Sequence, residues 1–119
     1  MSTLIEFTLR SQAATELAKQ IMLSNSGSKA TLYQYMYGVY RYCNYLGKMP
    51  DTLISECFQP NGELATANVN LHTRDLERFA MDLKASGLAP GTISNHVKGV
   101  KALYRANHVK VELSYRLSR

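Results

Sequence analysis

The amino-acid sequence predicts an all-α domain. Apolar side chains recur at the three- and four-residue spacing of a helix in several segments, and each segment is bounded by Gly, Pro or a capping side chain. Strand-like alternation is nearly absent. With 119 residues, 45% of them hydrophobic, the chain can bury one core but not two of ordinary size. We therefore expect one compact helical domain.

Two helices are expected in the first half of the chain. Residues 11–23 suit a helix with Ser11 as its N-cap, and the turn-forming segment 25–28 then ends it. No element is predicted for residues 1–10. Residues 28–46 form the second helix, closed by Gly47 as its C′ residue. Its apolar stripe comprises Leu32, Met36, Val39, Cys43 and Leu46, with Tyr35 and Tyr42 at the edge.

Three further helices are expected in the second half. Residues 50–58 suggest a short helix that begins at Pro50, and residues 59–70 are rich in turn formers and predict a surface connection. Thr73 is the expected N-cap of the next helix, which Gly87 ends. Leu88 is expected to fold back on that helix end, and Pro90 fits the first turn of a final helix reaching about Asn107.

The positive charge of the chain is concentrated at its C-terminal end. Residues 1–90 hold eight basic and eight acidic side chains, whereas residues 91–119 hold six basic and one acidic, which together give the net charge of +5. A basic surface attracts polyanions, so nucleic acid, an anionic membrane face and acidic proteins are all candidate partners.

The final helix carries two neighbouring stripes. One is an apolar stripe that suits a core and comprises Ile93, Val97, Val100 and Tyr104. The other is polar and basic, and no Asp or Glu occurs from residue 91 to 107. Short polar groups and long cations on one face are what a helix needs to contact successive DNA phosphates and base edges. A solvated helix face is the alternative reading. The polar candidates for DNA binding are Thr92, Ser94, Asn95, Lys98, Lys101 and Arg105.

The helix over residues 28–46 offers a second candidate DNA surface. Tyrosine donates to phosphate and packs on sugar, and cations supply most nonspecific affinity. The competing explanation is that these rings pack on other helices or on a partner subunit. The candidates on this helix are Lys29, Tyr33, Tyr37 and Arg41.

No catalytic, metal or cofactor site is predicted. Covalent DNA cleavage needs a nucleophile within a cluster of Arg, Lys and His, and no such cluster is apparent. Cys43 and Cys57 lack the spacing of a zinc site or disulfide framework and are expected to be reduced packing residues, while His96 is expected to be a half-buried helix residue. The absence of a signal sequence and of a long apolar stretch predicts a cytoplasmic protein without a membrane partner.

The order of these packing positions resembles a known family. It runs from Thr31-Leu32-x-x-Tyr35 through Thr73-x-Asp75-Leu76-x-x-Phe79 to the corner Gly87-Leu88-Ala-Pro90-x-Thr92-Ile93 and the helix after it. Over about residues 28–107 it is similar to the N-terminal core-binding domain of tyrosine recombinases, the phage-integrase type with a SAM-like helical fold. The resemblance implies a SAM-like bundle of four to five helices that forms one half of a clamp around double-stranded DNA.

The resemblance also implies partners and a division of the chain. Residues 1–107 would be the DNA-binding domain, and residues 108–119 a linker toward a catalytic domain of the same full-length protein, which acts with other recombinase subunits on DNA during integration or recombination. The chain ends before such a catalytic domain, so DNA binding is carried over and catalysis is not. Two alternatives remain: a stand-alone helical DNA-binding regulator and a SAM-like protein-interaction module.

Overall fold

The computed structural model describes residues 2–24 and 28–113. Within these residues the chain is helical and forms no strand, which confirms the all-α class. Its radius of gyration of 13.7 Å is close to the ~13.5 Å expected of a compact domain of this length. The six helices are α1 (Ser2–Leu9), α2 (Gln12–Ser24), α3 (Lys29–Leu46), α4 (Pro50–Ser55), α5 (Thr66–Ala85) and α6 (Pro90–Ala106).

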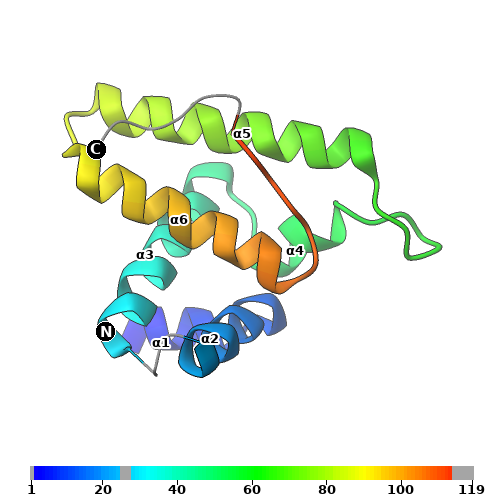
Figure 1. Cartoon of the computed structure of the whole chain (residues 1–119), viewed down its shortest axis with the longest axis horizontal. Helices are drawn as coiled ribbons and strands as arrows, with labels where there is room; N and C mark the ends of the chain where they lie inside the picture. The colour runs from blue at the N-terminus through cyan, green and yellow to red at the C-terminus, as the bar shows by residue number, and fades with distance from the viewer. Residues whose placement is uncertain (1, 25–27, 114–119) are drawn as a thin grey trace.

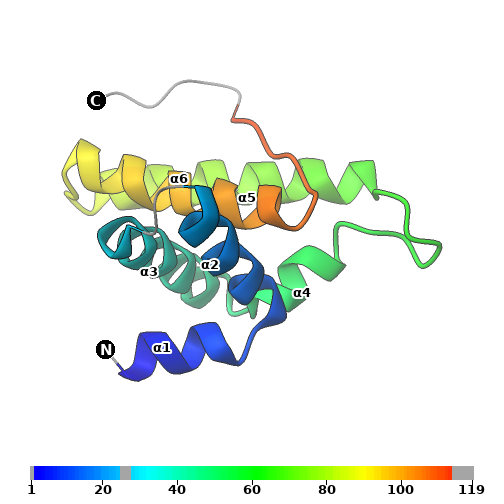
Figure 2. The same ribbon diagram turned by 60° about the horizontal axis from the view of Figure 1, so that its bottom comes forward.

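Helix α6 lies at the centre of the bundle. It packs most extensively on α3 and also contacts α2 and α5 (Figure 1). Helices α5 and α6 run antiparallel on either side of the corner at residues 86–89, and α1 lies on the far side of α2 and α3 (Figure 2). The stripe predicted to enter the core does so, because Ile93, Val97, Val100 and Tyr104 are all buried.

Two glycines allow α3 and α6 to approach each other closely. A Cβ atom on Gly38 would lie 2.7 Å from the His96 Cα atom, and one on Gly99 would lie 2.8 Å from the Tyr35 Cα atom. Real Cβ atoms do not approach backbone this closely, so the two helices are in backbone contact at these points. This crossing fixes the relative position of every side chain on the outer faces of α3 and α6.

Helix α1 occupies residues for which the sequence predicted no element. Phe7 is buried, and its ring packs edge to face on Tyr40 of α3, with centroids 5.1 Å apart. An eight-residue helix is too short to be stable alone, so it is held by this tertiary contact. That dependence explains why local periodicity did not reveal it.

The predicted helix ends are confirmed at most positions. Ser11 Oγ accepts a hydrogen bond from the Ala14 backbone N–H at 3.0 Å, as an N-cap does. Gly47 and Gly87 have φ of 70° and 93°, the left-handed conformation of a C′ residue. Pro90 occupies the first turn of α6. In the predicted break at 25–28, residues 25–27 lie outside the described residues.

The predicted start of α5 is wrong. The helix begins at Thr66, so residues 66–70 belong to it and not to a connection, and Thr73 lies in its interior. There the Thr73 hydroxyl donates to the Val69 carbonyl at 3.0 Å, one turn back, instead of capping the helix. The apolar face is longer than expected because Val69 and His72 continue it toward the N-terminus.

Helix α4 is shorter than predicted and ends at Ser55. The chain from 56 to 65 folds into a small projection, with a single β-bridge between Phe58 and Leu64 (Figure 1). Asp51 of α4 also caps a different helix, because its Oδ1 atom accepts from the Ala13 backbone N–H of α2 at 2.7 Å. This carboxylate therefore lies at the positive end of α2, where it is stabilising.

The described part of the predicted linker, residues 108–113, packs on the bundle. His108 adopts a left-handed φ of 69°, and the Val109 backbone N–H donates to the Tyr104 carbonyl at 2.8 Å. These features turn the chain back beside α6, where Val109 and Val111 are buried. Residues 114–119 lie outside the described residues.

No helix among the described residues combines the length and apolar character needed to cross a bilayer.

Candidate nucleic-acid interface

A row of cations follows the solvent-facing side of α6. Lys98 and Arg105 are exposed, and Lys101 and Ser94 are half-buried. Within residues 2–24 and 28–113, none of the three cations forms an ion pair. The opposite side of α6 is buried in the core. The predicted cationic stripe is therefore a single face that lacks acidic partners in the described part of the chain.

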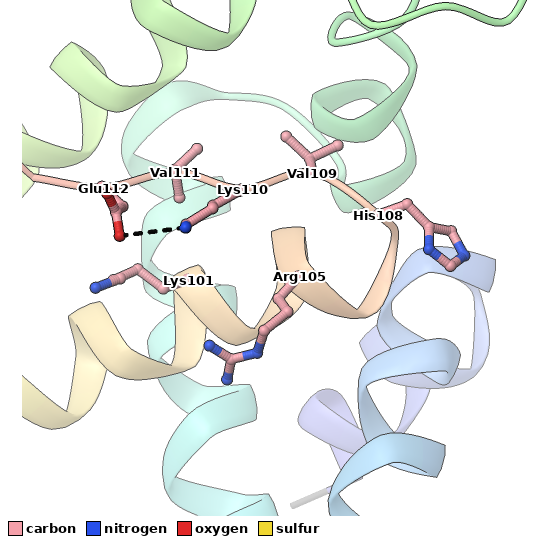
Figure 3. Close-up of a pocket in the computed structure, with 7 residues that line it drawn as sticks. All are labelled: Lys101, Arg105, His108, Val109, Lys110, Val111 and Glu112. Atoms are coloured by element: carbon pink, nitrogen blue, oxygen red, sulfur yellow. Dashed lines mark ion pairs between the residues drawn. The ribbon is translucent and has the colours of Figure 1, made fainter.

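The C-terminal segment adds two basic side chains to one end of this row. A hollow of about 470 Å³ lies between α6 and residues 108–112. Lys101 and Arg105 line it from the helix, and His108 and Lys110 line it from the segment (Figure 3). One acid is present: Glu112 lies 3.6 Å from Lys110 and balances that charge in part. Both side chains of this pair are well exposed, so the pair is weak.

A second hollow lies where the N-terminal half of α6 crosses α3. Its volume is about 140 Å³. The rings of Tyr33 and Tyr37 are nearly parallel, with centroids 6.1 Å apart. Four of the predicted residues thus meet at one place, two from each helix. The lining residues are Tyr33, Gln34, Tyr37, Thr92, Asn95 and His96.

Arg41 lies beside this second hollow and is not a free surface cation. Its Nη1 atom is 3.4 Å from the His96 Nε2 atom, and its guanidinium lies 6.0 Å from the centroid of the Tyr37 ring. Burial and the Arg41 charge lower the pKa of His96, so the imidazole is neutral near pH 7. His96 is buried, and not half-buried as predicted, because the Gly38 crossing brings α3 against it.

Lys29 is separated from the other predicted residues. It lines an apolar groove of about 460 Å³ between α1, α2 and α3, with Ile5, Leu9 and Met22 among its neighbours. Among the described residues, Tyr33 alone lines both this groove and the hollow at the α3–α6 crossing. The structure therefore places Lys29 at the margin of the candidate interface.

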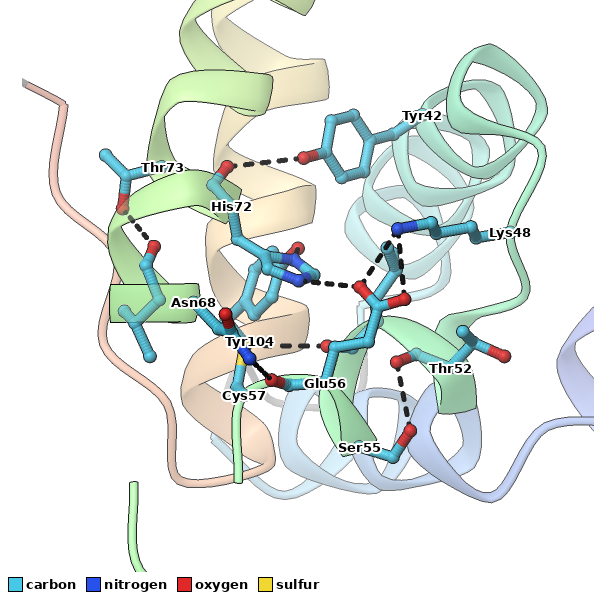
Figure 4. A network of polar contacts seen from close by, with 12 residues as sticks. Tyr42, Lys48, Thr52, Ser55, Glu56, Cys57, Asn68, His72, Thr73 and Tyr104 are labelled. Carbon is cyan, nitrogen blue, oxygen red and sulfur yellow. Dashed lines mark hydrogen bonds and ion pairs between the residues drawn. The ribbon is translucent and has the colours of Figure 1, made fainter. Parts of the chain in front are cut away.

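A polar chain that is buried at its inner end joins α5 and α6 to Glu56, the residue that follows α4. The His72 Nε2 atom lies 2.9 Å from Glu56 Oε1, and its Nδ1 atom lies 2.8 Å from the Tyr104 hydroxyl (Figure 4). Lys48 pairs with the same carboxylate at 3.0 Å. Burial, followed by the neighbouring Tyr42, raises the pKa of Tyr104, so its phenol stays protonated inside the core. This chain stabilises the bundle, since the Tyr104 side chain has no exposed surface.

Sequence reasoning did not include Gln34, His108 or Lys110 among the candidate site residues. Gln34 lies between two tyrosines and shows no local signal, because half of the residues that line the hollow come from a helix about sixty positions away. His108 and Lys110 follow the end of α6, and the left-handed turn at His108 decides where they point. The concentration of positive charge after residue 90 was the one available sign for Lys110.

Comparisons with models of known families, with curated proteins and with solved structures gave no match to this chain. Among the described residues, no group of three or more His, Cys, Asp or Glu side chains is placed to hold a metal ion.

Proposed function

We propose that this chain is the DNA-binding core-binding domain of a tyrosine recombinase or phage-type integrase, with the SAM-like fold of that family. It would grip double-stranded DNA at a recombination site and position a catalytic domain elsewhere in the full-length protein. The proposal draws on the sequence order of the packing residues between positions 28 and 107 and on the positive charge of α6. The family assignment rests on sequence resemblance, and the DNA-binding surface rests on geometry.

The observation that carries the proposal is the unpaired cation row on α6. Lys98, Lys101 and Arg105 follow one another at three- and four-residue spacing, so they are neighbours along one face. With a rise of 1.5 Å per residue, the helix from Thr92 to Arg105 spans roughly 20 Å, enough to contact several successive phosphates. Cations without acidic partners do not have to break an ion pair before they bind phosphate.

The two hollows extend this surface at either end. The basic hollow with His108 and Lys110 suits phosphate, and the tyrosine-lined hollow offers hydroxyl groups and rings for sugar and phosphate contacts. Arg41 contributes positive potential next to the second hollow. Helices α3 and α6 would thus face the same stretch of duplex, which is the arrangement that the resemblance implies.

The test is duplex binding by Lys98→Glu/Lys101→Glu. We expect its affinity to fall at least about tenfold, and the dependence of affinity on salt to become shallower, because two phosphate contacts are lost. Fluorescence anisotropy with a labelled duplex over a salt series measures both quantities. Circular dichroism and thermal melting should remain near those of the wild type, since neither lysine lies in the core or forms an ion pair among the described residues.

The matched control is Lys19→Glu/Lys84→Glu, which changes the net charge equally on α2 and α5. Both control lysines are exposed. The control should lose much less affinity than the α6 variant. Equal losses would indicate a nonspecific charge effect, and unchanged binding by the α6 variant would remove this helix from the interface.

One observation favours a protein-interaction module as a second candidate function. The groove between α1, α2 and α3 is almost entirely apolar, and Ile5 and Leu9 beside it are 58% and 74% exposed. Exposed apolar clusters of this kind often mark protein contacts. Sedimentation in the buffer used for DNA binding separates the two: dimers that are indifferent to duplex DNA would favour the interaction module.

A further inference from the structure

The hollow at the α3–α6 crossing holds two carboxamides from different helices. Gln34 comes from α3 and Asn95 from α6. Neither side chain makes a hydrogen bond to another described residue, so their amide and carbonyl groups are available to a ligand. Thr92 adds a hydroxyl and a methyl group to the same hollow. The lining therefore combines donors, acceptors and a small apolar group without a formal charge.

His96 is a neutral imidazole in this lining and adds no charge to it. A guanidinium has donors only, so Arg41 requires the nearby Nε2 atom to accept, and the proton of the neutral ring lies on Nδ1. The buried Nδ1 atom has no partner in the described part of the chain. Burial and the Arg41 charge lower the pKa of His96, so a second proton on the ring is disfavoured. The hollow is thus unlike the basic hollow at the other end of α6, where cations dominate.

The neutral lining favours a base edge over a phosphate as the ligand. Phosphate favours cations, which lie farther along α6 at Lys98, Lys101 and Arg105. A carboxamide presents a donor and an acceptor side by side, which matches the N6 and N7 atoms of adenine in the major groove. Guanine instead presents two acceptors there and is matched by Arg or Lys. Asn95 precedes Lys98 by three positions, so base and backbone contacts would be adjacent on one helix.

We infer that Gln34 and Asn95 are specificity-determining residues that each read the adenine of an A·T pair in the major groove, with Thr92 beside a thymine methyl group. This inference rests on the proposed DNA-binding function and deepens it. The cation row sets the affinity for any duplex, and the carboxamide hollow selects the sequence. Helices that enter the major groove commonly contact bases through their N-terminal residues, and Thr92 and Asn95 lie in the first two turns of α6.

The experiment is selection of duplexes from a random library by the wild type, Gln34→Ala, Asn95→Ala and the double variant. The wild type should enrich a motif with a fixed A·T pair, and each single variant should lose about fivefold or more of its discrimination at such a pair. Affinity for an unrelated duplex and its salt dependence should stay unchanged. Asn70→Ala, an exposed carboxamide of α5, is the matched control and should select the wild-type motif.

The possible outcomes distinguish base reading from the DNA-binding function on which it rests. If the wild type binds no duplex, both are rejected. If the wild type binds but shows no preference, or if the variants select the wild-type motif, base reading by these side chains is rejected and DNA binding stands. A G·C pair at the position that the variants control would also overturn the assignment. Thermal melts of each variant check that the fold is retained.

Discussion

At the scale of single residues, the close approach of α3 and α6 gives side chains properties that their type alone does not. His96 is an ordinary helix residue in the sequence, yet in the fold it is buried between Arg41 and Tyr37. Its ring lies 5.5 Å from the Tyr37 ring and 3.4 Å from the Arg41 guanidinium. A second charge at this place would be poorly solvated and would repel Arg41. His96 therefore links the pH of the solution to the stability of the contact between α3 and α6.

We predict that His96 makes the fold less stable in mild acid. Its pKa is lower in the folded state than the unfolded value of about 6.5, because burial and then Arg41 disfavour the imidazolium. The unfolded state therefore binds more protons between these two pKa values, and folding favours the neutral ring. Its contribution to stability is fully present above about pH 6.5 and is lost as the pH falls through the folded-state pKa.

Urea unfolding at pH 7.5 and pH 5 measures this effect. The wild type should lose more unfolding free energy on acidification than His96→Gln, in which this titration is absent. Every other titratable group is the same in both proteins, so the difference between the two proteins isolates His96. Identical losses would show that His96 titrates normally in the folded state.

At the scale of elements, the α3–α6 crossing decides the shape of the candidate interface. Gly38 and Gly99 are buried because each faces backbone of the other helix. Gly91, in the first turn of α6, faces open space instead. The same residue type thus has opposite roles in one helix. Only the two buried glycines are needed for the contact.

We predict opposite effects of two alanine substitutions in α6. Gly99→Ala should lower the unfolding free energy by about 1–3 kcal/mol, because the new methyl group would overlap Tyr35 backbone. Gly91→Ala should be neutral or stabilise by up to about 1 kcal/mol, because alanine is the better helix former and meets no neighbour. Denaturant melts of both variants measure the contrast. A Gly99→Ala variant as stable as Gly91→Ala would contradict the tight crossing.

At the scale of the whole molecule, one core unites residues from the first helix to the end of the described chain. Phe7, Leu53, Leu76 and Val109 all belong to it, although they come from four different regions of the sequence. Cys43 and Cys57 lie in the same core as free thiols. A core that draws residues from near both ends of the described chain should unfold as one unit.

We predict that both thiols react only when the whole domain opens. Burial, with Asp51 as a second cause, raises the pKa of Cys43 to about 12, and burial, with Glu56 as a second cause, raises that of Cys57 to about 11. At pH 8 a thiol reagent should react at least ~1000-fold more slowly with the native protein than with the protein in urea. Following the release of a coloured thiolate measures this ratio. Fast reaction of one thiol in native buffer would reveal local opening around it.

The sequence alone was enough for the all-α class, for most helix ends and for the core stripe of α6. Each of these depends on neighbours within about four residues, through hydrogen bonds along the helix or the left-handed conformation of Gly47 and Gly87. The start of α5 was missed for the same reason: Thr73 has the local pattern of a cap, but packing of Val69 and His72 extends the helix beyond it.

The candidate site also has one part that the sequence predicted and another that it did not. The cation row was predictable because its members share one helix face, whereas the hollow containing Gln34 and the turn that places His108 and Lys110 were not. These depend on contacts between segments distant in the sequence, and the Gly38–Gly99 crossing sets the most important of them. Local periodicity determined which face of α6 meets solvent, and only tertiary packing decided which side chains of other elements lie next to that face.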